Sequence, residues 1–134
     1  MTLTVVLQQS LAQRDLKFPD SCFNAYGLAD AAYDLDRLIT DRGVRPFTDF
    51  IYDGNILSEE EYAEMGQTRP ERKWFDAADG LQTVAHLISR LEPRDADEPI
   101  EGCTVGDLLA ELKVVQAMLR RAEESGEPFS FEVC

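Results

Sequence analysis

One segment of this chain gathers most of the residue types that could do chemistry. It is KWFDAADGLQTVAHLISRL, Lys73 to Leu91, and it holds the single tryptophan, Trp74, and the single histidine, His86. It also holds Asp76 and Asp79, three residues apart. A histidine beside carboxylates suggests general acid–base catalysis, and paired carboxylates suggest a cation site. Each possibility competes with a simpler interpretation, that of a capped amphipathic helix.

An enzyme that uses His86 needs more than a histidine. A catalytic base requires a nucleophile within hydrogen-bonding reach and a third group that orients the imidazole ring. Thr83 and Ser89 stand three residues on either side of His86, a spacing that any helix produces. The sequence contains no G-x-S-x-G, no Walker A motif and no G-x-G-x-x-G. We therefore expect no catalytic residue and no cofactor, and an enzyme based on His86 remains the weakest of three functional hypotheses.

The two aspartates are better explained as helix-starting residues than as metal ligands. DAADG begins like a calcium loop, but position 12 counted from Asp76 is Leu87 instead of the required glutamate. Asp76 suits the N-cap of a helix, and Asp79 then falls in its first turn, where a carboxylate faces the positive end of the helix dipole. We expect capping and no bound metal.

A second row of carboxylates lies further upstream. Asp30, Asp34 and Asp41 share one face of a predicted helix, with Arg37 among them. Di-iron sites in helical bundles use inward glutamates and E-x-x-H motifs, which this chain lacks. The row therefore predicts a solvated polar face.

Net charge constrains the possible partners. The chain has 134 residues and a formal net charge of −13. Such a surface repels nucleic-acid phosphates and anionic lipids, and the basic segment RPERK, residues 69–73, is flanked by acidic ones. We expect no nucleic acid and no membrane as partners. An acidic surface suits a basic protein partner, with solubility alone as the simpler interpretation.

The cysteines and the start of the sequence point to the cytoplasm. Cys22, Cys103 and Cys134 are odd in number and far apart, which argues against a disulfide framework or a zinc site and favours reduced thiols. The first fifteen residues have neither the basic region nor the small-residue cleavage site of a secretory signal. No apolar run approaches the roughly 18 residues that span a bilayer.

The hydrophobic pattern predicts an α+β fold over a single domain, residues 1–134. Three main helices and one short one pack on a small sheet formed largely by the N- and C-terminal strands. Residues 47 to 52 are a candidate third strand. The predicted strands are Leu3 to Leu7 and Phe129 to Val133, and the predicted helices are Ala25 to Arg42, Ser58 to Met65, Ala77 to Leu91 and Val105 to Ser125.

Helix ends and faces follow from the same pattern. We expect Asn24 to cap the first main helix and Gly43 to end it in a left-handed conformation. The predicted helix 77–91 places His86 nearly opposite its apolar face, solvated. That face consists of Leu81, Val84, Ala85, Ile88 and Leu91, with Leu87 at its edge. The last helix is apolar over so wide an arc that it suits a central position or a homodimer face.

Aromatic residues concentrate in the middle of the chain, where secondary structure is least defined. They are core residues in the simplest interpretation and anchors of a partner-binding groove in the functional one. The candidate binding residues are Asp49, Tyr52, Asp53, Trp74 and His86. The first hypothesis is a non-enzymatic protein-binding module, in its extreme form immunity- or inhibitor-like. The alternative is a small-ligand-binding or accessory regulatory domain.

The pattern GVRPFTDF, then KWFDAADGLQTVAHLISRL, a long helix and a final FSFEV resembles a group of small bacterial proteins of unknown function. The resemblance covers most of the chain and implies a bacterial cytosolic source. It implies no activity, cofactor or catalytic residue.

Overall fold

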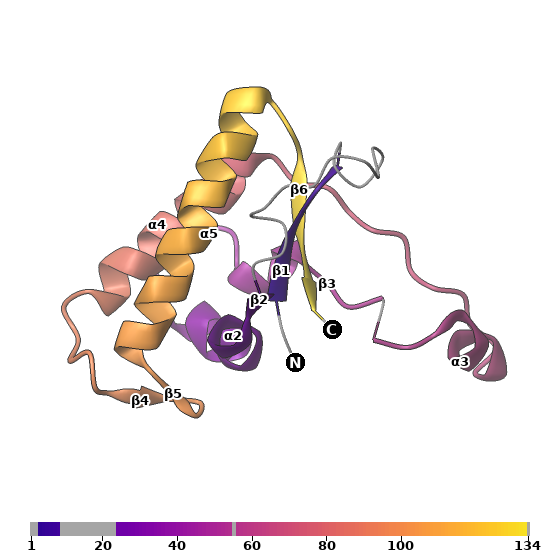
Figure 1. The fold of residues 1–134 in the computed structure, drawn as a ribbon, viewed down its shortest axis with the longest axis horizontal. Helices are drawn as coiled ribbons and strands as arrows, with labels where there is room; N and C mark the ends of the chain where they lie inside the picture. Colours follow the sequence, from indigo (N-terminus) through magenta and orange to yellow (C-terminus); the bar gives the residue numbers. More distant parts are fainter. Residues whose placement is uncertain (1–2, 9–23, 55, 134) are drawn as a thin grey trace.

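The structure is a computed structural model that describes residues 3–8, 24–54 and 56–133 (Figure 1). The elements in chain order are β1 (Leu3–Leu7), β2 (Asn24–Ala25), α2 (Tyr26–Leu38), the 3-10 helix η2 (Phe47–Phe50), β3 (Ile51–Tyr52), α3 (Glu59–Glu64), α4 (Ala77–Leu91), β4 (Pro99–Ile100), β5 (Cys103–Thr104), α5 (Val105–Ser125) and β6 (Phe129–Val133). The predicted α+β class is confirmed.

The two terminal strands form the centre of a four-stranded sheet of order β2-β1-β6-β3. β1 pairs antiparallel with β6 along its whole length, from Leu3 opposite Val133 to Leu7 opposite Phe129. β3 pairs parallel with β6 at the edge, with Ile51 opposite Phe131. The expected third strand is therefore only two residues long, because residues 47 to 50 form a 3-10 turn.

One face of the sheet carries the core. Phe129, Phe131 and Val133 alternate along β6 and are buried, as are Leu3 and Val5 on β1. Since successive residues of a strand point to opposite faces, Ser130 and Glu132 lie on the face turned away from the core. α4 and α5 run side by side beside the sheet, whereas α3 stands well apart from the other helices (Figure 1). α3 buries none of its own residues.

The buried face of α4 is rotated from the predicted one. Leu87 is fully buried, not at an edge, whereas Ala85 is exposed. The rotation arises because α4 packs between α5 and the segment around η2. Gly80 lies against the Phe129 ring, and the Thr83 hydroxyl donates a hydrogen bond to the Arg45 carbonyl oxygen at 2.7 Å.

The ends of α2 also differ from expectation. Asn24 lies in β2, so it is not the helix cap. The backbone N–H groups of Gly27 and Leu28 donate instead to Oε1 of Glu111, on α5, at 3.1 and 3.5 Å. The helix ends at Leu38, and Gly43 does not adopt a left-handed backbone.

Asp76 occupies the predicted N-cap position of α4, but its side chain accepts no cap hydrogen bond, so the expected capping by this aspartate is not seen. The starts of α3 and α5 and the end of α5 follow the prediction. Ser58 with Glu61 and Thr104 with Asp107 form capping boxes at α3 and α5, and Gly126 ends α5 at φ 68°. The acidic loop before α5 contains an unpredicted feature, the hairpin β4–β5.

Cys22 and Cys134 lie outside the described residues, whereas Cys103 is a free thiol. Within the described ranges, no group of three or more potential metal ligands gathers. Among the helices of the described part, none has the length and apolar character needed to cross a membrane.

Candidate binding site

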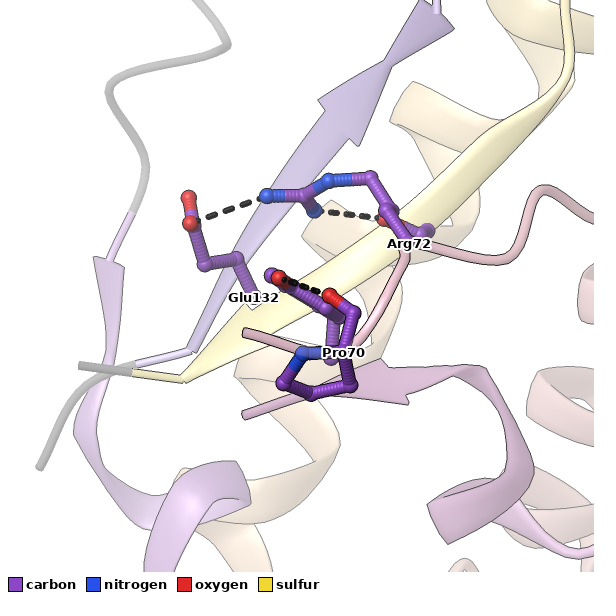
Figure 2. A network of polar contacts seen from close by, with 5 residues as sticks. Pro70, Arg72 and Glu132 are labelled. Carbon is purple, nitrogen blue, oxygen red and sulfur yellow. Dashed lines mark hydrogen bonds and ion pairs between the residues drawn. The ribbon is translucent and has the colours of Figure 1, made fainter. Parts of the chain in front are cut away.

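Arg72 fastens the segment before α4 to the outer face of the sheet (Figure 2). Its guanidinium donates from Nη1 to Ser130 Oγ at 2.8 Å and forms an ion pair from Nη2 to Glu132 Oε1 at 2.9 Å. The Arg72 side chain is only 12% exposed. Two side chains on the outer face of β6 therefore hold one arginine in a fixed position.

Two aromatic rings flank the same guanidinium. The Arg72 Cζ atom lies 4.3 Å from the Tyr52 ring centroid and 5.5 Å from that of Trp74. The Tyr52 hydroxyl donates to the Pro70 carbonyl oxygen at 2.7 Å (Figure 2). Cation–π attraction and this hydrogen bond fix the orientation of Tyr52 at the end of β3.

A surface pocket of about 220 Å³, which we name the acidic pocket, opens beside Tyr52. The exposed carboxylates of Asp49, Asp53 and Glu71 line it, and within the described part of the chain they form no ion pair. Lys73 lines it as well, so the lining carries an excess of negative charge. The complete lining is Asp49, Phe50, Ile51, Tyr52, Asp53, Pro70, Glu71, Lys73 and Phe75.

A second pocket of about 190 Å³, which we name the apolar pocket, adjoins the first. Tyr33 and Ile56, two large apolar residues that are 77% and 49% exposed, form part of its wall. Its lining is Ala29, Ala32, Tyr33, Thr48, Ile51, Asp53, Ile56 and Val133. The two pockets share Ile51 and Asp53, so they meet at the edge strand β3.

The structure brings three of the five candidate residues together. Asp49, Tyr52 and Asp53 line the acidic pocket, whereas Trp74 is not among its lining residues and contacts Arg72 instead. His86 lies elsewhere, next to the end of α2.

His86 is only partly solvated, so the expectation of a solvated side chain holds in part. Its side chain is half-buried, and Nε2 accepts a hydrogen bond from the Thr40 backbone N–H at 3.4 Å. The chain leaving α2 folds over this part of α4, which helical periodicity within α4 alone does not reveal.

The sequence did not indicate a binding role for Glu71, Arg72 and Lys73, because their segment, RPERK, was considered only as a basic patch for nucleic acid. Nor did it indicate Tyr33 and Ile56 as pocket residues. The partners of Arg72 on β6 are 58 and 60 residues away in the sequence. The available signal was an arginine next to a run of aromatic residues, a common arrangement for cation–π stacking.

Comparison of the chain with protein-family models, with curated proteins and with solved structures gave no match.

Proposed function

We propose that the protein is a non-enzymatic binding module that recognises a basic segment of another protein. The acidic pocket receives a lysine or arginine side chain of that partner. The observation that carries the proposal is the convergence of three exposed carboxylates, Asp49, Asp53 and Glu71, on one pocket beside the ring of Tyr52.

The chemistry of the pocket matches a cationic side chain. Hydrogen bonds between an ammonium or guanidinium group and a carboxylate are about twice as strong as neutral ones. Aromatic side chains next to the carboxylates contact the apolar stem of a lysine or arginine. The net charge of −13 attracts a basic partner at long range and speeds its association at low salt.

The site is also held in shape before any partner arrives. Tyr52 is fixed by Arg72 and by its hydrogen bond to Pro70, and Arg72 is fixed by Ser130 and Glu132. A preorganised site loses less conformational entropy on binding, so more of the contact energy contributes to affinity.

We place this function in the cytosol. The support is the free thiol of Cys103 and the wide spacing of the three cysteines, both typical of a reducing compartment.

Selection from a random library tests the proposal. We would pan a phage-displayed library of random 12-residue peptides against the full chain at low salt. The enriched peptides are expected to share a lysine or arginine at one position. Their affinity should fall about tenfold, or about 1.4 kcal/mol, in the double variant Asp49→Asn/Glu71→Gln.

A charge-matched control separates the pocket from general electrostatics. Asp97→Asn/Glu124→Gln removes the same two charges at exposed positions that do not line the acidic pocket. This variant should bind the peptides nearly as the wild type does. Equal losses in both variants, or peptides without an enriched basic residue, would overturn the proposal.

A further inference from the structure

We infer that the recognised segment is extended and carries an apolar side chain next to its basic one. The apolar side chain enters the apolar pocket while the basic one occupies the acidic pocket. This inference rests on the proposed function, because the acidic pocket supplies the first contact. The inference adds a second requirement, an apolar residue next to the basic one, whereas the proposed function by itself requires only the positive charge.

The relative position of the two pockets is the first support. They share Ile51 and Asp53 and meet at β3, which is the edge strand of the sheet. Ile51 is aligned with the buried Phe131, and Tyr52 is aligned with Glu132 on the outer face. Ile51 and Tyr52 therefore point to opposite faces, and the acidic pocket includes Tyr52 whereas the apolar pocket does not.

The geometry of an extended chain fits this arrangement. Consecutive side chains of a strand point to opposite sides, and the backbone rises about 3.3 Å per residue. Peptides bound at a sheet edge commonly place alternate side chains into separate pockets, which supply specificity. Neighbouring residues of a segment that crosses the edge at β3 can therefore reach the two pockets separately.

Exposed apolar surface is the second support. Tyr33 is 77% exposed and Ile56 is 49% exposed, and both line the apolar pocket. Tyr33 projects from α2, and Ile56 follows β3 by four residues, so two separate parts of the fold expose apolar side chains around one hollow. An apolar side chain bound there would remove both from water, which is favourable.

Charge decides between a basic partner segment and a second copy of this chain. Each copy carries a net charge of −13, and Asp53 lies in the wall of the apolar pocket itself. Docking a second acidic molecule there brings like charges together, whereas a basic segment complements Asp53 and the neighbouring Asp49.

The test compares peptide selections on three proteins. The wild type is panned with the random 12-residue library alongside the variant Tyr33→Ser/Ile56→Ser. The third protein is Tyr26→Ser/Val114→Ser, which replaces two other exposed apolar residues, 67% and 41% exposed, away from both pockets. Far-UV circular dichroism confirms that each variant is folded.

The wild type and the control variant should enrich a basic residue with an apolar residue next to it. The Tyr33→Ser/Ile56→Ser variant should keep the basic preference, lose the apolar one, and bind the wild-type peptides about tenfold more weakly. If that variant fails to fold, the peptides enriched by the wild type still test the inference, because they either do or do not carry an apolar residue next to the basic one.

Two other outcomes have different meanings. Enrichment of a basic residue without an apolar neighbour overturns this inference and leaves the proposed function standing. Absence of any basic preference overturns both. A concentration-dependent dimer detected by sedimentation, with the apolar-pocket variant monomeric, would overturn the inference in favour of a second copy as the occupant.

Discussion

The guanidinium of Arg72 lies 4.3 Å from the centroid of the Tyr52 ring. The same group is bonded to Ser130 and Glu132 on β6, so one side chain connects the segment before α4, the edge strand β3 and the central strand β6. The position of Tyr52 in the acidic pocket therefore depends on an arginine that faces the sheet.

Replacing Arg72 should destabilise the fold. Arg72→Met removes two charge-assisted contacts and leaves Glu132, whose side chain is 20% exposed, without this cation. We expect a loss of about 2 kcal/mol in the free energy of unfolding, measured by urea denaturation followed by Trp74 fluorescence. Arg72→Lys should recover only part of the loss, because an ammonium group cannot reproduce the planar fork.

Arg69→Met is the matched control. Its partner Glu59 is 83% exposed and lies 3.7 Å away, so the pair contributes little. Equal losses for the two methionine variants would contradict the role given to Arg72.

Gly80 allows α4 to approach β6 closely. A Cβ atom added there would lie 2.4 Å from Cζ and 2.7 Å from Cε1 of the Phe129 ring, which is fully buried. Alanine favours a helix over glycine by about 1 kcal/mol, but overpacking a core typically costs about 1–3 kcal/mol. We expect Gly80→Ala to lower the melting temperature. Gly106→Ala should change it much less, because a Cβ atom added at Gly106 would lie 3.3 Å from its nearest neighbour, the Ala96 carbonyl oxygen. A more stable Gly80→Ala variant would show that the ring can move aside.

Glu111 should make stability depend on pH. Burial raises the pKa of its carboxyl above the ordinary value of 4.5. The hydrogen bonds from Leu28 and Gly27 lower this pKa, but their effect is smaller than that of burial. The negative charges of Asp107 and Asp30 raise the pKa further. A raised folded-state pKa favours the protonated form in the native protein. The stabilising contribution is therefore complete below the unfolded-state pKa and is lost as pH rises through the folded-state pKa.

The variant Glu111→Gln isolates this effect from the other carboxylates. Glutamine keeps an oxygen acceptor for the Gly27 N–H and does not ionise. The unfolding free energy of Glu111→Gln relative to wild type should therefore increase from acidic to neutral pH, measured by urea titration at several pH values. A constant difference across that range would show that the pKa of Glu111 is the same in the folded and unfolded states.

Lys73 should weaken recognition of basic peptides. It lines the acidic pocket with Asp49, Asp53 and Glu71, so its positive charge opposes a bound cation. Lys73→Gln should raise the affinity for the selected peptides by a fewfold at low salt, with a smaller gain at high salt because screening increases. Fluorescence anisotropy of a labelled peptide measures both, and an unchanged affinity at low salt would place the bound cation away from Lys73.

The candidate site was only partly predictable from the sequence. Asp49, Tyr52 and Asp53 were found because an irregular, aromatic-rich segment tends to carry function. Tyr33 was not predicted to line a pocket. It lies on α2 outside the apolar stripe, and such a position by itself indicates only an exposed helix residue. His86 was included only as the single histidine of the chain, and it lies apart from the others.

Local patterns in the sequence by themselves determined α3, α4 and α5 and the two terminal strands. Their signals, capping boxes and hydrophobic periods, act between residues a few positions apart. Only the tertiary structure decided which arc of α4 is buried. Hydrophobic periodicity shows that α4 has an apolar stripe, but the position of the buried arc within and beside that stripe depends on which elements pack against the helix. The tertiary structure also supplied the cap of α2, from Glu111, 84 residues beyond Gly27, and the anchoring of Arg72 on β6. These contacts join elements whose spacing in the sequence carries no information about their distance in the fold.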